Sequence, residues 1–119
     1  MNYRQQVGQF GERLAAQYLI RQGFEIVGRN VKTSYQEIDL IAKLKDLLVF
    51  VEVKTRTSTK FGQADEAVGP VKIANLKQAV QNYLYANNLA PLAIRVDLIS
   101  VDIDKNKKTA KIKHYKDII

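Results

Sequence analysis

The sequence predicts an α/β fold in which a helix, three strands, a second helix and two further strands follow one another. Apolar residues recur at three- and four-residue steps in two segments, and they alternate or cluster in five shorter ones. Turn-forming residues separate these segments. With 119 residues, 46% of them hydrophobic and 26% charged, the chain is long enough to bury a core. We therefore expect one domain over residues 1–119.

The first segment, residues 2–23, is expected to be a helix with one buried face. Gly23 ends it, because glycine readily adopts the left-handed conformation that terminates helices. The apolar residues at helical spacing, which we expect to face the core, are Val7, Phe10, Leu14, Tyr18 and Leu19.

Three strands are expected next, at residues 24–30, 35–42 and 47–56, with a hairpin turn at residues 43–46 between the last two. Pro70 suits the first turn of a second helix, which should reach about Asn88. The apolar positions expected on its inward face are Ile73, Leu76, Val80 and Tyr83 or Leu84. Two strands near residues 92–103 and 109–115 complete the order.

The charge balance favours an acidic partner. Nineteen Lys and Arg residues against twelve Asp and Glu give a formal net charge of +7, and nucleic acid is the commonest partner of such proteins. The absence of cysteine excludes thiol catalysis, disulfides and thiolate zinc sites, and the single histidine, His114, leaves almost no room for imidazole metal clusters or a Ser-His-Asp triad. Any catalysis must rest on carboxylates, lysines, hydroxyls and a hard cation.

The amino-terminal residues do not resemble a signal peptide, because Arg4, Glu12 and Arg13 interrupt any apolar stretch. The longest uninterrupted aliphatic and aromatic run, residues 47–51, is too short to cross a bilayer. We therefore expect a soluble, cytoplasmic protein that does not associate with membranes.

The hairpin at residues 35–56 carries charged side chains in alternation with aliphatic ones. Glu52, Lys54 and Arg56 share one face of their strand, opposite three valines that belong to the core. Glu37 and Asp39 likewise share one face of the preceding strand. If the turn consists of residues 45 and 46, paired residue numbers sum to 91, which places Asp39 opposite Glu52 and Glu37 opposite Lys54.

Two carboxylates on opposed strand positions repel each other, take up a proton or share a cation. Mg²⁺ prefers oxygen ligands, and it assists phosphodiester hydrolysis. Lys54 could then hold the attacking water or stabilise developing negative charge. The pattern by itself leaves open a catalytic metal site and a solvated cluster of ion pairs on a sheet face.

Other charged residues extend this candidate site. Glu12 lies at the border of the apolar face of the first helix, and Gly8, one turn earlier, leaves open space before its carboxylate. A boundary glutamate that only solubilises the helix is the alternative. Glu37 is a supporting ligand or an ion-pair partner. The basic residues after the motif, which could contact phosphates or be plain surface charges, are Arg56, Lys60, Lys72 and Lys77.

The spacing of Asp39, twelve residues and then Glu52-Val53-Lys54 resembles the PD-(D/E)XK nuclease motif in its archaeal Holliday junction resolvase form. Across nearly the whole chain, the runs GERLAAQYL (11–19), RN (29–30), EIDLIA (37–42), VFVEVKTR (49–56) and RVDLISV (95–101) resemble the YraN-like family of uncharacterised bacterial proteins. Gln36 stands where that family's pattern has glycine, so the backbone or access near Asp39 is expected to differ.

The resemblance implies a restriction endonuclease-like core, with a mixed sheet between helices, and a homodimer as in junction resolvases. It implies that Asp39, Glu52 and Glu12 bind Mg²⁺ or Mn²⁺ and that Lys54 positions the nucleophilic water. The expected function is divalent-metal-dependent endonuclease cleavage of DNA, with branched DNA as a candidate substrate. The alternatives are a non-catalytic nucleic-acid-binding module and a protein-interaction domain with the same fold.

Overall fold

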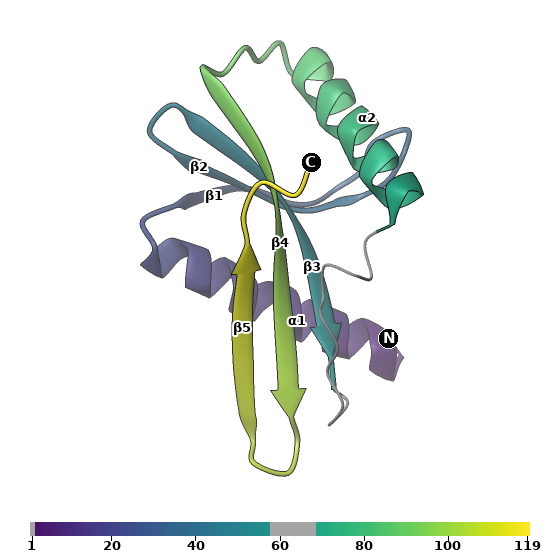
Figure 1. The fold of residues 1–119 in the computed structure, drawn as a ribbon, viewed down its shortest axis with the longest axis vertical. Helices are drawn as coiled ribbons and strands as arrows, with labels where there is room; N and C mark the ends of the chain where they lie inside the picture. The colour runs from purple at the N-terminus through teal and green to yellow at the C-terminus, as the bar shows by residue number, and fades with distance from the viewer. Residues whose placement is uncertain (1, 58–68) are drawn as a thin grey trace.

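The computed structural model describes residues 2–57 and 69–119 and confirms the expected α/β order. The first helix and the three strands that follow it precede the gap, and the remaining elements follow it (Figure 1). The elements are α1 (Tyr3–Arg21), β1 (Glu25–Val31), β2 (Ile38–Leu44), β3 (Leu47–Arg56), α2 (Pro70–Ala86), β4 (Ala93–Asp104) and β5 (Thr109–Tyr115).

The five strands form one mixed sheet in the order β1-β2-β3-β4-β5. β3 and β4 are parallel, and the other neighbouring strands are antiparallel. A parallel pair needs a long crossover connection, and α2 lies within the connection between β3 and β4 (Figure 1). The mixed sheet with flanking helices matches the core that the sequence resemblance implies.

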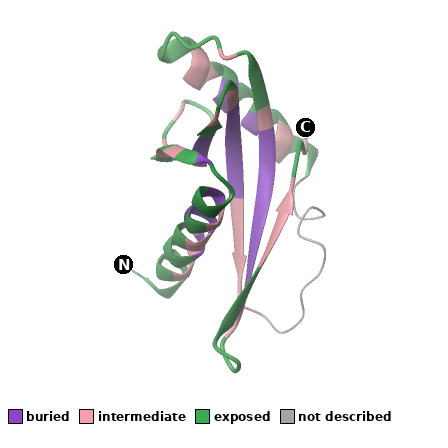
Figure 2. Ribbon diagram, turned by 90° about the vertical axis from the view of Figure 1, so that its left-hand side faces the viewer, coloured by how far each residue is buried: buried purple, intermediate pink, exposed green. Residues whose placement is uncertain are grey.

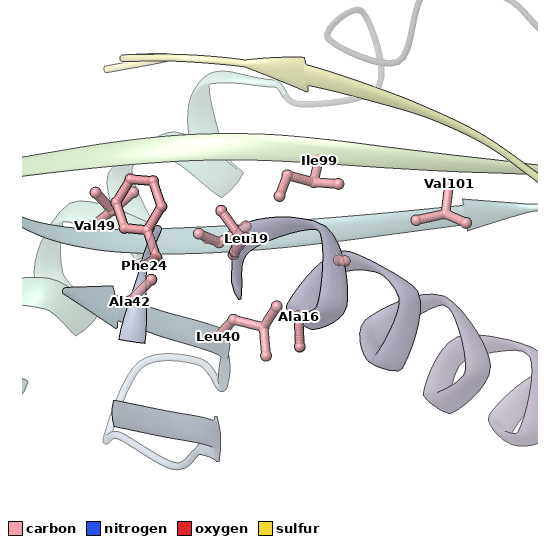
Figure 3. Close-up of a cluster of buried hydrophobic side chains, with 10 residues drawn as sticks. Ala16, Leu19, Phe24, Leu40, Ala42, Val49, Ile99 and Val101 are labelled. Atoms are coloured by element: carbon pink, nitrogen blue, oxygen red, sulfur yellow. The ribbon is translucent and has the colours of Figure 1, made fainter. Parts of the chain in front are cut away.

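The two helices cover opposite faces of the sheet, so both faces are apolar at its centre. On the α1 face, a cluster of buried side chains includes Leu19, Leu40, Val49 and Ile99 (Figure 3). On the α2 face, a second cluster includes Phe50 and residues of α2. The expectation that the β2–β3 hairpin is apolar on one face only is therefore wrong, and the buried strand centres form a continuous layer (Figure 2).

α1 buries a narrower stripe of smaller residues than its periodicity suggests. Its buried residues are Gly11, Ala15, Ala16 and Leu19, whereas Phe10 is 41% exposed. The cause is close packing, because a Cβ at Gly11 would overlap the side chain of Thr55 on β3. The helix therefore approaches the sheet through its small residues and leaves the larger ones at the edges. α2 buries Leu76 and Val80 as expected, together with Ala79.

The hairpin register follows the two-residue turn. The paired residues run from Leu44 and Leu47 to Leu40 and Val51, so their numbers sum to 91 as expected, and Lys45 adopts a positive φ of 55° in the turn. β2 begins at Ile38 rather than at Tyr35, which corrects the expected strand.

The turn before β2 explains its later start. The Thr33 hydroxyl accepts hydrogen bonds from the backbone N–H groups of residues 35 and 36 and donates to the Gln36 carbonyl at 2.7 Å. These bonds hold residues 33–36 in a turn, so Glu37 lies outside the strand and does not form the expected strand pair with Lys54.

A buried polar network anchors β5 and the carboxyl-terminal residues. Asp97, fully buried on β4, accepts two hydrogen bonds from Arg95 at 2.9 Å and one from the Asp117 backbone N–H. Its Oδ2 also lies 2.7 Å from His114 Nε2, and the Nδ1 of the same ring lies 3.0 Å from the Tyr18 hydroxyl. The histidine thus links α1 to β4. In the described parts of the chain, no helix is long and apolar enough to span a membrane.

Candidate functional site

Asp39 lies where β2 separates from β3. The last paired residues are Leu40 and Val51, and the Val53 N–H donates instead to Asp39 Oδ2 at 2.8 Å. The alternation of side chains is interrupted at this point, because Ile38 joins the apolar cluster under α2 and Leu40 joins the cluster under α1. At the end of the hairpin, the Asp39 carboxylate therefore accepts the hydrogen bond that a backbone carbonyl would accept in a continued strand pair. This bond holds the carboxylate in a fixed position.

Glu52 is buried on β3, with only 6% of its surface exposed. Its Oε1 pairs with Lys72 Nζ of α2 at 3.2 Å. Its Oε2 is buried and has no hydrogen-bond partner in the structure. A buried oxygen of this kind is costly unless something compensates it, so Glu52 has one oxygen neutralised and one available to a ligand.

Glu12 reaches the same site from α1. With its amide oriented so that the nitrogen faces the carboxylates, Asn30 donates hydrogen bonds of 3.0 Å to Oε1 of Glu12 and to Oε1 of Glu37. Asn30 has a φ of 50°, a left-handed conformation that asparagine tolerates well. Glu37 is therefore part of the site through Asn30 rather than through Lys54.

The carboxyl groups are electrostatically coupled. Burial and the nearby charge of Glu52 together raise the pKa of Asp39 to about 7, although the hydrogen bond from the Val53 N–H acts to lower it. Burial also raises the pKa of Glu12 above its usual value, with Glu37 and Glu52 adding to the increase, whereas hydrogen bonds with Asn30 and Asp39 lower it. Like charges held together out of water favour uptake of a proton or a cation.

Two lysines accompany the carboxylates. Lys54 is half-buried two residues beyond Glu52, so strand alternation places it on the same face of β3. Lys72 comes from the first turn of α2 and pairs with Glu52. A lysine beside a carboxylate cluster neutralises part of its charge and can also donate to an oxyanion.

The donor set fits a hard divalent cation in its chemistry. Mg²⁺ and Mn²⁺ favour oxygen ligands, and Glu12, Asp39 and the unpartnered Oε2 of Glu52 supply them. Within residues 2–57 and 69–119, however, no three acidic or histidine side chains are grouped so that they could hold an ion. Glu52 is turned toward Lys72 on the α2 face, so joint ligation requires these side chains to reorient.

The basic residues named from the sequence have different roles in the structure. Arg56 forms an ion pair with Asp102 at 3.1 Å, and Lys72 pairs with Glu52. Lys77 is exposed on α2, and Lys60 lies outside the described residues. Gln36 contributes its backbone to the Thr33 turn, and its side-chain nitrogen is buried without a partner. Two of the expected phosphate contacts are thus engaged with acidic residues.

A hollow of about 420 Å³ lies beside Glu12 on the β1 side of α1. We call it the β1-side hollow. Its lining residues are Gln6, Gln9, Glu12, Arg13, Arg29, Asn30 and Leu40. The sequence interpretation did not identify Asn30, Arg13 or Arg29 as site residues. The sequence offered only the RN pair at 29–30 and the arginine next to Glu12 as a signal. It could not show that these residues lie close together, because that depends on how α1 packs on β1 and β2.

Comparison with known proteins identifies the family. Residues 11–101 match the uncharacterised protein family UPF0102. The chain belongs to UPF0102. A UPF0102 protein of Syntrophomonas wolfei is 46% identical over 109 residues, which are 92% of this chain and 93% of that relative. A UPF0102 protein of Flavobacterium psychrophilum is 42% identical over 111 residues, 93% and 91% of the two chains.

The family membership covers the candidate site. A more distant UPF0102 protein, from Beutenbergia cavernae, is 34% identical over 118 residues, 99% of each chain. The UPF0102 match includes Glu12, Asp39, Glu52 and Lys54 and omits the first turns of α1 and all of β5. The resemblance to the YraN-like family of uncharacterised proteins is confirmed.

Proposed function

We propose that this UPF0102 protein is a divalent-metal-dependent nuclease that hydrolyses phosphodiester bonds in DNA. The observation that carries the proposal is the electrostatic interaction among Glu12, Asp39 and Glu52, three carboxylates whose charges act on one another. The pKa of Asp39 is raised to about 7 by burial and by Glu52, which is an arrangement that costs stability. Clusters of this kind are characteristic of functional sites.

Each residue has a separate task in the proposed reaction. Glu12, Asp39 and Glu52 would hold Mg²⁺ or Mn²⁺, and the bond from the Val53 N–H fixes the Asp39 carboxylate. The chemistry that a bound divalent cation supplies is polarisation of a phosphoryl oxygen and a lowered pKa of its water. Lys54 donates hydrogen bonds to the attacking water or to the developing charge on phosphorus oxygens.

The net charge of +7 supports nucleic acid as the substrate. Arg13 and Arg29 line the β1-side hollow next to Glu12, where they could contact the phosphates that flank the cleaved one. These contacts position a backbone without reading its sequence. We therefore propose DNA of a particular structure, with branched DNA first, as the substrate, and the cytoplasm as the place of action.

A second function is favoured by one feature of the site. Glu52 is paired with Lys72, and the carboxylates of the described residues are not grouped as a formed metal site. A protein that binds nucleic acid without cleaving it would keep such an ion pair permanently. Both functions predict that the protein binds nucleic acid, so only a cleavage measurement distinguishes them.

The test is a cleavage assay on labelled four-way junction, flap, duplex and single-stranded DNA, with Mg²⁺, Mn²⁺ or a chelator. We compare the wild type with Asp39→Asn and Glu52→Gln, and we use Glu25→Gln, an exposed carboxylate on β1, as the matched control. We expect cleavage that requires metal, that is lost by at least a hundredfold in both site variants and that is unchanged in the control.

Three outcomes separate the functions. Binding of the panel without cutting in any metal would establish the non-catalytic module. Cleavage at the wild-type rate in Asp39→Asn and Glu52→Gln would contradict the site assignment, because the activity would then come from elsewhere or from a contaminant. Absence of both binding and cleavage would contradict both functions.

A further inference from the structure

A second hollow lies on the other side of Glu12, between the first turns of α1 and the end of β3. Its volume is about 290 Å³, close to the lower end of the range for small-ligand sites. Tyr3, Arg4 and Gly8 line it from α1, Thr55 lines it from β3, and Thr57 lines it from just beyond the end of β3. We call it the β3-side hollow. Because Glu12 lines both hollows, this residue separates two spaces on either side of the helix.

Gly8 keeps this hollow open. A Cβ built at Gly8 meets nothing within 4 Å, whereas a Cβ at Gly11, one turn further along, would overlap Thr55. α1 therefore diverges from β3 toward its amino terminus, like the two sides of a wedge. Glycine in a helix interior is destabilising relative to alanine. Packing explains that cost at Gly11 but not at Gly8, where the fold itself has room for a side chain.

The lining of the hollow suits a phosphodiester group. Arg4 supplies a guanidinium, and Tyr3, Thr55 and Thr57 supply hydroxyl groups, which together can donate to phosphate oxygens. Lys105 Nζ lies 4.2 Å from the centre of the Tyr3 ring and adds a second cation. Tyr3 is 54% exposed, so a sugar or a base can reach this residue.

The amino-terminal N–H groups of α1 are not the basis of this site. Asn2 and Gln5 form a reciprocal cap, with the Gln5 N–H donating to Asn2 Oδ1 at 2.8 Å. The donors that face the hollow are therefore side chains, and their geometry depends on the wedge between α1 and β3. Glu12 at its inner boundary is the acidic residue of the hollow and also belongs to the candidate metal site.

We infer that the β3-side hollow binds the sugar-phosphate unit of a nucleotide next to the phosphate that is cleaved. This inference rests on the proposed function. It adds the path of the DNA strand, which would cross α1 at Glu12. Tyr3, Arg4, Thr55 and Thr57 hold the backbone of that nucleotide, and the absence of a side chain at Gly8 provides the space.

The experiment fills the hollow with a side chain and measures DNA binding. Gly8→Leu occupies the space, and Gln17→Leu is the matched control, because it adds the same side chain at an exposed position of α1 that does not line the hollow. The probe is a fluorescein-labelled four-way junction in chelator at two salt concentrations, read by anisotropy. We expect Gln17→Leu to bind like the wild type and Gly8→Leu to bind at least tenfold more weakly, with a melting temperature no lower than that of the wild type.

A second variant keeps the inference testable if Gly8→Leu fails to fold. Arg4 is exposed, so Arg4→Gln leaves the packing intact, and Arg21→Gln at the other end of α1 is its control. We expect Arg4→Gln, but not its control, to weaken DNA binding several-fold. The slope of log binding constant against log salt concentration should fall in magnitude by about one, as for the loss of one phosphate contact.

The outcomes distinguish this inference from the proposed function. If Gly8→Leu and Arg4→Gln bind within twofold of their controls while wild-type protein still binds and cuts DNA, the hollow is not a subsite and the nuclease remains. If the variants lose binding but no protein cuts, the subsite holds for a non-catalytic module. If the wild type binds no DNA, both proposals are contradicted.

Discussion

At the scale of single residues, strand alternation predicted candidate site residues but not their surroundings. Asp39, Glu52 and Lys54 could be chosen because acidic and basic residues interrupt two aliphatic strands at fixed positions. The pairing of Glu52 with Lys72 and the bridge from Asn30 could not be predicted, since they join residues far apart in the chain. Such contacts depend on how both helices pack on the sheet, which no local pattern specifies.

The raised pKa of Asp39 predicts that the protein becomes less stable as pH increases. The pKa of this carboxyl is 3.8 in the unfolded chain and about 7 in the folded one. Its contribution to the free energy of unfolding is therefore fully present below pH 3.8. That contribution is lost as the pH rises through 7. It amounts to at most about 4 kcal/mol. In chelator, urea unfolding between pH 5 and 8 should show the free energy of unfolding of wild type decreasing more steeply than that of Asp39→Asn.

Asp39→Asn is a suitable comparison because an amide oxygen can still accept the hydrogen bond from Val53. At pH 8 we expect this variant to be more stable than the wild type, since it removes a charge from a crowded cluster. Equal pH dependence in the two proteins would show that the Asp39 carboxyl is not perturbed by the fold.

Asp97 is expected to be the most important polar residue for stability. It is fully buried and accepts hydrogen bonds from Arg95 and the Asp117 N–H, with His114 at 2.7 Å. Asp97→Ala leaves a guanidinium without its partner, so we expect a loss of about 3 to 5 kcal/mol in the free energy of unfolding. The measurement is urea unfolding at pH 7, with Glu25→Gln as control, and a loss below 1 kcal/mol would contradict the role of the network.

At the scale of elements, the sequence predicted the order of helices and strands and the hairpin register. One strand boundary and one packing face were wrong for physical reasons. β2 starts at Ile38, because the Thr33 hydroxyl holds the preceding residues in a turn. α1 buries Gly11 and alanines rather than Phe10, because close approach to β3 favours small side chains over the most hydrophobic ones.

The two glycines of α1 should respond in opposite ways to the same substitution. Gly11→Ala forces a methyl group into Thr55, and overpacking of this kind costs about 1 to 3 kcal/mol. Gly8→Ala meets no atom within 4 Å, so it should stabilise the protein by up to about 1 kcal/mol through helix propensity. Thermal unfolding of both variants checks this, and a similar change in the two would contradict the wedge between α1 and β3.

At the scale of the whole molecule, the carboxyl-terminal residues connect the two sides of the sheet. The Asp117 N–H donates to Asp97, the Ile118 N–H donates to the Val96 carbonyl at 2.8 Å, and the Ile118 side chain packs against the apolar cluster under α2. These contacts join β5 to the α2 face. The homodimer implied by the resemblance stays a prediction, which sedimentation velocity would test.

Removal of residues 117–119 should therefore destabilise the molecule. Two backbone hydrogen bonds and the burial of Ile118 are lost, which we expect to lower the free energy of unfolding by about 2 to 3 kcal/mol. The truncated chain should still bind metal and DNA, because no site residue is removed. Urea unfolding measures the loss, and unchanged stability would show that these residues do not secure the sheet.

Glu12, Asp39 and Glu52 are proposed to form a site for a divalent cation. The most direct measurement is titration of the chelator-treated protein with Mn²⁺ in a calorimeter, for the wild type, Asp39→Asn, Glu52→Gln and the Glu25→Gln control. We expect saturable Mn²⁺ binding by the wild type and the control, and binding at least tenfold weaker in both site variants. Binding of equal strength in all four proteins, or in none, would contradict this site.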